Sequence, residues 1–361
     1  MTRKGNTRIE VRATERVITD EDVVIVGLDV HKASCHLSVR VNGEELVSVV
    51  TPSTSAAVIR AVTPYQAGLR AVIYEAGPTG YGLARALMRE EWPVMVVAPG
   101  KTPQPANRGT KFDRRDAGQL SLLGGVPGAL TAVAIPTEGD DHDRAVVRLR
   151  AQLTAARRRA KQHIRSFLLY HGIAEPEGLK NWANWALKEL EELPVAPQER
   201  LIVTTHIAEL RYQSAQIAKV EHELDQIARS PRHAEAMGYL TSIPGVGSIT
   251  AIAFRLEVFD PERFTCAGEL VAYVGLAPGI WQSGETQRAR PLIKAGRRHL
   301  RALLVEAAWQ WKARDAYARR VYDRTYATTR CPQKAIVAVA RHLAIRMWHL
   351  EVHRERYRAA A

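Results

Sequence analysis

The stretch VVIVGLDV, at Val23–Val30, decides the fold of the first part of this chain. Its apolar and β-branched residues predict a buried strand. HLSVRV at 36–41 alternates in polarity, and LVSVVT at 46–51 follows it after Asn42 and Gly43, a pair typical of a hairpin turn. Three successive strands joined by short turns predict that the sheet begins with antiparallel pairing.

Helices and strands alternate after this point. The predicted elements are a helix at 56–62, a strand at 69–75, a helix at 79–91 capped by Thr79, and a strand at 94–98. The resulting order, βββαβαβ, is typical of an α/β RNase H-like (RuvC-like) domain. We place this domain at 21–135, after a flexible N-terminal arm at 1–20.

The rest of the chain is predicted to be helical. Two apolar stripes recur at three- and four-residue steps: Val146, Leu149, Leu153, Ala156, Ala160, Ile164 and Phe167, then Leu210, Ile217, Val220, Leu224 and Ile227. The second stripe is heptad-like, so we expect a helical linker at 140–235 that forms a hairpin or coiled coil, with a plain bundle as the alternative. A mainly α-helical domain at 236–361 follows, in which we predict a loop at 277–286 and a basic helix from about Lys294 to Lys312.

Positive charge is concentrated in two zones. The chain has 51 Lys and Arg against 38 Asp and Glu, a net charge of +13 and a pI near 9.8. Residues 285–361 hold 18 Lys and Arg against 6 acids, and residues 144–165 hold eight basic residues and no acid. Such localised charge favours nucleic acid as the partner over a merely basic soluble protein. Arg157, Arg158 and Arg159 form the densest part of the second zone.

The cysteines and the hydropathy pattern point to an intracellular protein. The three cysteines are far apart and form no CxxC pair, so the sequence indicates neither a zinc site nor a disulfide framework. Apolar runs stay below the ~18 residues that a membrane span requires. The polar N-terminus lacks the apolar core of a signal peptide. We therefore expect a cytoplasmic protein with no membrane partner.

Four acidic residues are placed where a metal site is expected. Asp29 and Glu75 each end a predicted strand, and Asp113 and Asp116 lie three residues apart at the start of a helix, so that they share a face. A carboxylate cluster of this kind holds two Mg²⁺ or Mn²⁺ ions about 4 Å apart in phosphoryl transfer. Flanking basic residues are candidates for DNA phosphate contacts: Lys111, Arg114 and Arg115. The alternative for Asp116 is a helix cap.

A second constellation lies near the C-terminus. Ser283 precedes a glycine, which lets the backbone approach a ligand closely. Cations that would stabilise a phosphoryl transition state or bind DNA follow it: Arg288, Arg290, Lys294, Arg297, Arg298 and Arg301. By itself a Ser-Gly pair is typical of a turn, and a basic helix is typical of a DNA-contact surface. The glycines of PGVG, Gly245 and Gly247, suggest either a helix-hairpin-helix phosphate contact or a tight packed turn.

Taken in order, these motifs resemble the DEDD-type insertion-sequence transposases. The matching stretches are GLDVHK, YEAGPTGYGLARAL, KFDRRDAGQLSLL, LTSIPGVGSITA, LVAYVGLAPGIWQSG and LIKAGRRHLRALLVEAAW, from about Val23 to Met347. That family pairs a RuvC-like N-terminal domain with a serine-bearing C-terminal transposase domain. It usually has Asn where Arg297 stands and a small or polar residue where Pro291 stands, so contacts of the basic helix differ here.

The resemblance implies a function for both constellations. It makes Asp29, Glu75, Asp113 and Asp116 the metal-binding quartet, with Mg²⁺ or Mn²⁺, and Ser283 the nucleophile of a DNA recombinase. It also implies donor and target DNA, a structured noncoding guide RNA (bridge RNA) as partners, a homodimer or dimer of dimers, and a bacterial, nucleoid-associated location. Two alternatives stay open: a RuvC-like nuclease with a water nucleophile, and a non-catalytic nucleic-acid-binding protein.

Overall fold

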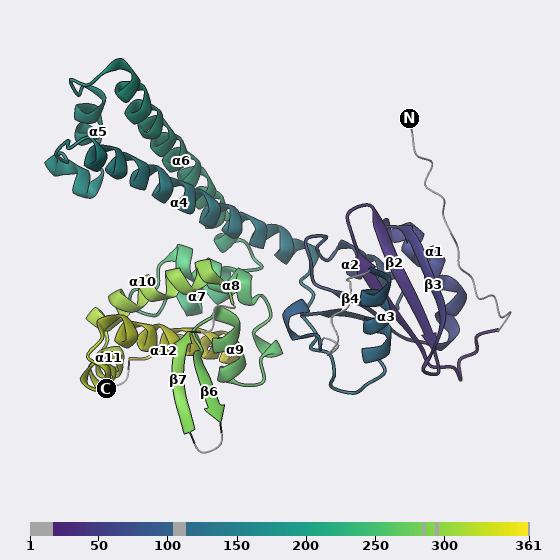
Figure 1. Cartoon of the computed structure of the whole chain (residues 1–361). Coiled ribbons are helices and arrows are strands. Elements are labelled where there is room, and N and C mark those ends of the chain that lie inside the picture. The colour runs from purple at the N-terminus through teal and green to yellow at the C-terminus, as the bar shows by residue number, and fades with distance from the viewer. Residues whose placement is uncertain (1–16, 104–112, 284–285, 293–295, 360–361) are drawn as a thin grey trace. The chain divides into compact units, whose positions relative to one another are not determined.

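In a computed structural model of the chain, the opening apolar run is the central strand of a five-stranded sheet (Figure 1). The structure describes residues 17–103, 113–283, 286–292 and 296–359, without the side chains of 113, 114, 280–283 and 286–291. The chain separates into two compact units, residues 1–136 and 137–361. Most of the predicted arm at 1–20 lies outside the described residues.

The first unit contains the predicted order of elements. They are β1 (Val24–Val30), β2 (Ser34–Val41), β3 (Glu44–Pro52), α1 (Ser55–Val62), β4 (Leu69–Glu75), α2 (Gly82–Arg89), β5 (Val94–Val97) and α3 (Asp113–Leu123). The strand order is β3-β2-β1-β4-β5. The pairs β1–β2 and β2–β3 are antiparallel, whereas β1–β4 and β4–β5 are parallel. The βββαβαβ prediction is confirmed.

The predicted cap of α2 is wrong. The helix begins at Gly82 after Tyr81, and no side chain caps it. The Gly80 amide instead donates to the Gly77 carbonyl at 3.2 Å, so Thr79 lies within a turn that precedes the helix.

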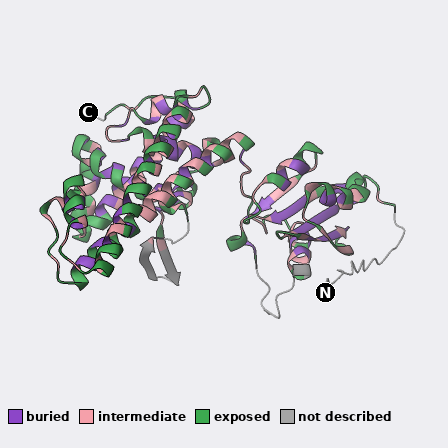
Figure 2. Ribbon diagram, turned by 90° about the horizontal axis from the view of Figure 1, so that it is seen from above, coloured by how far each residue is buried: buried purple, intermediate pink, exposed green. Residues whose placement is uncertain are grey.

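The central strand is buried because helices cover both faces of the sheet (Figure 2). Val24, Val26 and Leu28 belong to a core shared with residues of α1 and α2. Ile25 belongs instead to a small core with Ile73 and with Leu120 of α3. Because side chains alternate along a strand, odd-numbered residues of β1 face α3.

The second unit is mainly helical. Its helices are α4 (Glu138–Tyr170), α5 (Asn184–Glu191), α6 (Pro197–Arg229), α7 (Ala234–Leu240), α8 (Ser248–Val258), α9 (Ala267–Val274), α10 (Arg298–Arg314), α11 (Ala316–Thr329) and α12 (Pro332–His353). Among the described residues, no helix is both long and apolar enough to span a membrane.

The two longest helices form an antiparallel hairpin, as one of the predicted alternatives had it (Figure 1). Arg150 pairs with Glu221 near one end and His171 with Glu199 near the other. Leu210, Ile217 and Leu224 are buried as the heptad-like stripe predicts. The predicted apolar stripe on α4 is wrong at one position: Leu149 is 44% exposed, because Val147 takes the buried position instead.

A β-hairpin stands where a loop was predicted. It consists of β6 (Pro278–Ser283) and β7 (Thr286–Leu292), which pair antiparallel. The basic helix is also shorter than predicted, since α10 begins at Arg298. Gly296, two residues before this helix, has a φ of +95°, which an α-helix does not accommodate.

Candidate active site

Asp29 and Glu75 lie at the same edge of the sheet. The strands β1 and β4 are parallel, with Leu28 opposite Tyr74. The next residue of each strand is an acid, Asp29 on β1 and Glu75 on β4, and these two acids are therefore neighbours. Asp29 lies two residues beyond Gly27 and Glu75 two beyond Ile73, and both of these face α3. The two carboxylates, each half-buried, therefore project from neighbouring strands on the face that α3 covers.

The helix α3 brings the other two acids toward that edge. A Cβ on Gly27 would lie 2.1 Å from the Ala117 carbonyl oxygen, so helix and strand touch backbone to backbone. A Cβ on Gly124 would meet Ile73 at 2.2 Å, nearer the amino end of the strands than Asp29 and Glu75. The helix thus runs opposite to β1, and its first turn, which carries Asp113 and Asp116, points to the carboxyl edge of the sheet. Asp116 is half-buried.

Neighbouring side chains set the electrostatics of this edge. Nε2 of His31 lies 3.1 Å from Oδ2 of Asp29. Burial, with a smaller effect of Asp29, raises the pKa of the Cys35 thiol to about 12. That thiol therefore stays protonated at neutral pH. The interpretation of the sequence missed His31, although its place two residues after Asp29 in GLDVHK was a signal for it.

The chemistry of the donors fits a hard divalent cation. Carboxylate oxygens are the ligands that Mg²⁺ and Mn²⁺ prefer. Among the side chains that the structure describes, no three His, Cys, Asp or Glu form a metal-binding group. The Asp113 side chain and all of Lys111 lie outside the described residues, as does the Arg114 side chain, while Arg115 is exposed.

Ser283 ends the first strand of the β-hairpin. In the register it lies opposite Thr286, and these two residues form the last described pair at that end of the hairpin. Its side chain, those of Arg288 and Arg290, and the whole of Lys294 lie outside the described residues. The backbone of Arg288 and Arg290 lies on β7, opposite Trp281 and Gly279.

A buried acid joins the base of this hairpin to the helices. Glu257 on α8 is fully buried, and Arg148 of α4 contacts it through two nitrogens at 3.0 and 3.2 Å. Arg297 lies 3.3 Å and His299 3.0 Å from its carboxylate. Burial would raise the pKa of Glu257, but the hydrogen bonds from His299 and Arg148 and the charges of Arg148 and Arg297 lower it to about 2. No pattern in the sequence singles out Glu257.

Two of the predicted nucleic-acid contacts are engaged inside the domain. Arg297 contacts Glu257, and Arg301 donates to the Gly275 carbonyl at 3.0 Å. Gly296 packs on Gly275, where a Cβ would lie 2.6 Å from the amide nitrogen. Arg298 is exposed. These contacts hold together the segments that enter and leave the hairpin.

The two glycines of PGVG differ. Gly245 has φ of +92°, and a Cβ there would lie 2.6 Å from Cβ of Gln310 on α10. It therefore makes the tight packed turn that was one of the two alternatives. Gly247 is exposed immediately before α8, where helix amides face outward.

The basic run on α4 divides into two parts. Arg144 contacts Asp141 at 2.9 Å, Arg148 contacts Glu257, and Arg150 contacts Glu221. These three cations thus form ion pairs within the second unit. Arg158 and Arg159 are exposed and Arg157 is half-buried, so the second part of the run remains the candidate nucleic-acid surface.

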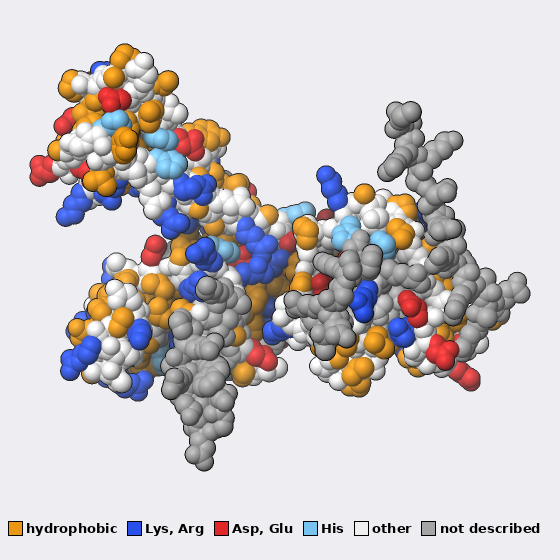
Figure 3. Space-filling model, viewed as in Figure 1, with side chains coloured by type: hydrophobic (Ala, Val, Ile, Leu, Met, Phe, Trp, Pro, Cys, Tyr) orange, Lys and Arg blue, Asp and Glu red, His pale blue; other side chains and the backbone are white. Residues whose placement is uncertain are grey.

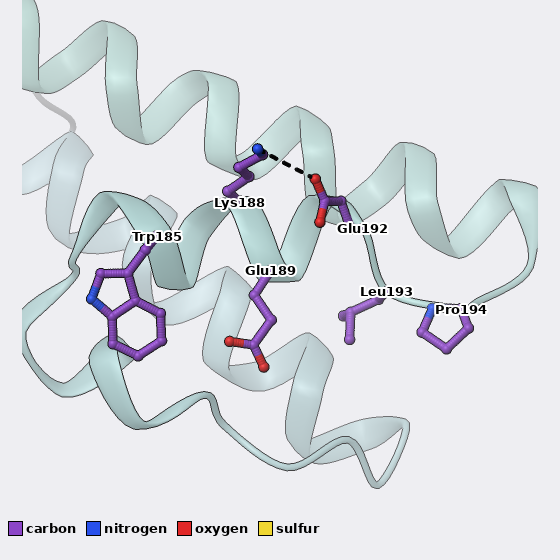
Figure 4. A pocket seen from close by; sticks show the side chains of 6 residues that line it. All are labelled: Trp185, Lys188, Glu189, Glu192, Leu193 and Pro194. Atoms are coloured by element: carbon purple, nitrogen blue, oxygen red, sulfur yellow. Dashed lines mark ion pairs between the residues drawn. The ribbon is translucent and has the colours of Figure 1, made fainter.

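A hollow of about 470 Å³ near α5 belongs to neither constellation (Figure 4). It is lined by Trp185, Lys188, Glu189, Glu192, Leu193 and Pro194. Lys188 and Glu192 form an ion pair at 3.8 Å within it. Its mixed charges offer no cluster of cations for a phosphate.

Comparison with known proteins identifies the family. Residues 237–323 match the sequence model described as "Transposase IS116/IS110/IS902 family", and residues 26–172 match the DEDD transposase domain of IS110 elements, described as "Transposase". A Sinorhizobium fredii protein named as a transposase is 32% identical over 302 residues, 82% of this chain and 74% of the relative. The chain belongs to the IS110 family of transposases.

Other relatives of this IS110-family transposase come from insertion sequences. The transposase for element IS1111A of Coxiella burnetii is 26% identical over 77% of this chain and 76% of its own length. The transposase for element IS1533 of Leptospira borgpetersenii is 29% identical over 66% of this chain and 69% of its own length. The protein is thus an insertion-sequence transposase, an enzyme of DNA strand transfer, as the resemblance implied.

Proposed function

We propose that this transposase cleaves and exchanges DNA strands under the guidance of a structured noncoding RNA. Asp29, Glu75, Asp113 and Asp116 form its metal site, and Ser283 is its nucleophile. The observation that carries the metal site is the placement of Asp29 and Glu75 on one face of neighbouring parallel strands, with the first turn of α3 directed to the same edge. When bound there, Mg²⁺ or Mn²⁺ would polarise the scissile phosphate and neutralise charge that develops on it.

We further propose that the first unit is an RNase H-like domain. The strand order β3-β2-β1-β4-β5, with β2 antiparallel to its neighbours, supports this assignment. In such an arrangement β1 is central, so an acid at its end lies beside the acids of β4 and α3. Asp29 and Glu75 would bind the cation directly, and the contact with His31 would orient Asp29.

The strand-transfer step we propose conserves phosphodiester bonds. Oγ of Ser283 bonds to phosphorus while one bridging P–O bond breaks, the serine losing a proton and the leaving oxygen gaining one. Attack by the hydroxyl of the partner strand then forms a new phosphodiester and returns the proton to Ser283. Water and nucleotide cofactors are not consumed. The contacts of Arg297 with Glu257 and of Arg301 with the Gly275 carbonyl would hold the hairpin that carries Ser283 in place during both attacks.

Recombination needs two duplexes at once, which favours an oligomer. We propose a homodimer or a dimer of dimers that binds donor and target DNA. The exposed cations Arg158 and Arg159 on α4 are candidates for contacts with the guide RNA or with DNA.

The experiment that tests the serine step traps the reaction on a nicked DNA substrate and identifies the DNA-linked peptide by mass. We expect the linked peptide to contain Ser283 and Ser283→Ala to form no adduct while it still binds DNA. Thr286→Ala, opposite Ser283 in the hairpin register, is the matched control. A linked peptide without Ser283, or recombination by Ser283→Ala, would support a metal-dependent nuclease with a water nucleophile instead.

A second experiment tests the metal site separately. Asp29→Asn should abolish cleavage and remove the rise in melting temperature that Mn²⁺ produces, since crowded carboxylates repel one another without a cation. Cleavage in the presence of a chelator would contradict the metal site. Sequencing RNA that co-purifies with the protein tests the guide.

A further inference from the structure

An aromatic ladder lies on α10 and α11, outside both constellations. Trp309 of α10 and Tyr322 of α11 have ring centroids 5.9 Å apart, and Tyr322 stacks on Tyr326 at 6.0 Å with the planes only 10° from parallel. Trp309 is 43% exposed and Tyr326 38% exposed. The ladder therefore presents ring surface to solvent at both of its ends.

Burial does not account for this arrangement. The neighbouring Trp311 is fully buried and belongs to the core of the second unit, as do Leu304 and Val321. Tyr322 packs against that core, whereas Trp309 and Tyr326 lie outside it. Exposed aromatic rings clustered on one surface commonly mark an interaction site.

Cations surround the ladder. Nζ of Lys312 lies 3.4 Å from the centroid of Tyr322 and 5.2 Å from that of Trp309. Residues 298–330 hold eight Lys and Arg against three acids: Asp315 is buried as the cap of α11, and the exposed Glu306 and Asp323 each lie three residues before one of the exposed rings. The helical step of three and four places the exposed Arg319 on the face of Tyr322 and Tyr326. Figure 3 shows Lys and Arg side chains gathered around the α11 end of this unit.

The excess of cations and the exposed rings of Trp309 and Tyr326 favour one kind of occupant. Ring surfaces stack on unpaired nucleobases irrespective of their identity, and nearby cations follow the phosphates. A duplex hides its base faces, so it would meet the cations but not the rings. An acidic protein would pair with the cations, but the negative potential over the ring faces disfavours contact with carboxylates.

We propose that the exposed rings of Trp309 and Tyr326, with Lys312 and Arg319, bind unpaired nucleotides of a nucleic-acid strand. Strand transfer by a transposase exposes unpaired DNA, and a folded RNA also offers unpaired bases. The proposal goes beyond the function proposed above and is independent of the nucleophile, so the adduct experiment can fail while this one succeeds.

The test measures binding of the full-length protein to labelled oligothymidylate, oligouridylate of the same length and a duplex of the same length. Tyr326→Leu and Trp309→Leu should each weaken binding of an oligomer by about 5-fold to 100-fold, the range for loss of one stacked base. Duplex binding should change less than about twofold. Whichever oligomer depends more on Tyr326 identifies DNA or RNA as the source of the unpaired strand.

Three controls separate stacking from folding. Tyr326→Phe keeps the ring and should bind as the wild type does. Trp185→Leu removes a tryptophan that is 57% exposed in another part of the unit, and it should leave binding unchanged. Lys312→Gln should lower the slope of log affinity against log salt by about 0.7, as for one phosphate contact on a single strand.

Two outcomes would overturn the proposal. In one, both leucine variants bind both oligomers as tightly as the wild type while retaining its melting temperature. In the other, they lose duplex and oligomer binding to the same extent. Either result would assign the ladder to packing between α10 and α11.

Discussion

Glu351 offers a quantitative test of the second unit's core. It lies on α12, is 7% exposed, and neither of its carboxylate oxygens has a hydrogen-bond partner among the residues that the structure describes. Arg255 of α8 approaches it to 3.7 Å. Burial raises the pKa of Glu351 to about 7, against the smaller opposing effect of Arg255.

The sign of the effect follows from the raised pKa. The protonated form is favoured in the folded state, so its contribution to stability is complete below the ordinary glutamate pKa of 4.5 and is lost as the pH rises through about 7. A shift from 4.5 to about 7 corresponds to about 3 kcal/mol at most, since one pKa unit is worth about 1.4 kcal/mol. The ionised carboxylate thus destabilises this unit in mildly alkaline solution.

Replacing Glu351 by glutamine keeps the shape of the side chain and removes its ionisation. We expect Glu351→Gln to be more stable than the wild type by about 3 kcal/mol at pH 8.5 but by only about 1 kcal/mol at pH 5.5, which is one unit above the ordinary pKa of 4.5. Denaturant unfolding at both pH values, followed by hydrogen exchange of α12 amides, measures this difference. Glu355→Gln, at an exposed position beyond the same helix, is the control.

The reasoning would be refuted by an equal loss of stability between pH 5.5 and pH 8.5 in the wild type and in Glu351→Gln. That result would mean that the carboxylate finds partners or water when it ionises.

Three further predictions concern the sites. Glu257→Gln removes the buried anion that Arg148, Arg297 and His299 contact, so it should lower the free energy of unfolding by about 3–5 kcal/mol. The surface variant Glu306→Gln is the control and should leave that free energy unchanged. Equal denaturant midpoints for Glu257→Gln and the wild type would contradict this prediction. Gly27→Ala should displace α3 and abolish Mn²⁺-dependent cleavage of DNA. Gly82→Ala is the control, since a Cβ at Gly82 meets open space, and it should keep the activity. An active Gly27→Ala enzyme would mean that α3 does not position the acids of the metal site. Reversing the charge of Arg158 and Arg159 should lower the slope of log affinity for nucleic acid against log salt concentration by about 0.7–0.9 for each lost contact. Charge reversal at the exposed Lys219 is the control and should leave this slope unchanged. An unchanged slope in the Arg158 and Arg159 variant would show that this face of α4 contacts only solvent.

The local pattern of residue types was sufficient to predict the strands and turns of the first unit. The β-branched run at Val24–Val30, the Asn42-Gly43 turn and the strand at Leu69–Glu75 each follow from neighbouring residues, and all appear in the structure. Strand ends are also local features, so the positions of Asp29 and Glu75 were predictable. Their common face was not, because it depends on the parallel pairing of β1 with β4 and on the close approach of α3 at Gly27.

Tertiary structure decided the roles of the charged residues. A count of Lys and Arg treats Arg148, Arg158, Arg297 and Arg298 alike, yet Arg148 and Arg297 contact the buried Glu257 while Arg158 and Arg298 are exposed. The hairpin that carries Ser283 was likewise read as a loop, since its strands lack a clear alternation of polar and apolar residues. Sequence determines how many charges a chain carries, but partners far apart along the chain determine which of them remain available to a ligand, because an ion pair forms only where folding brings its two members within reach.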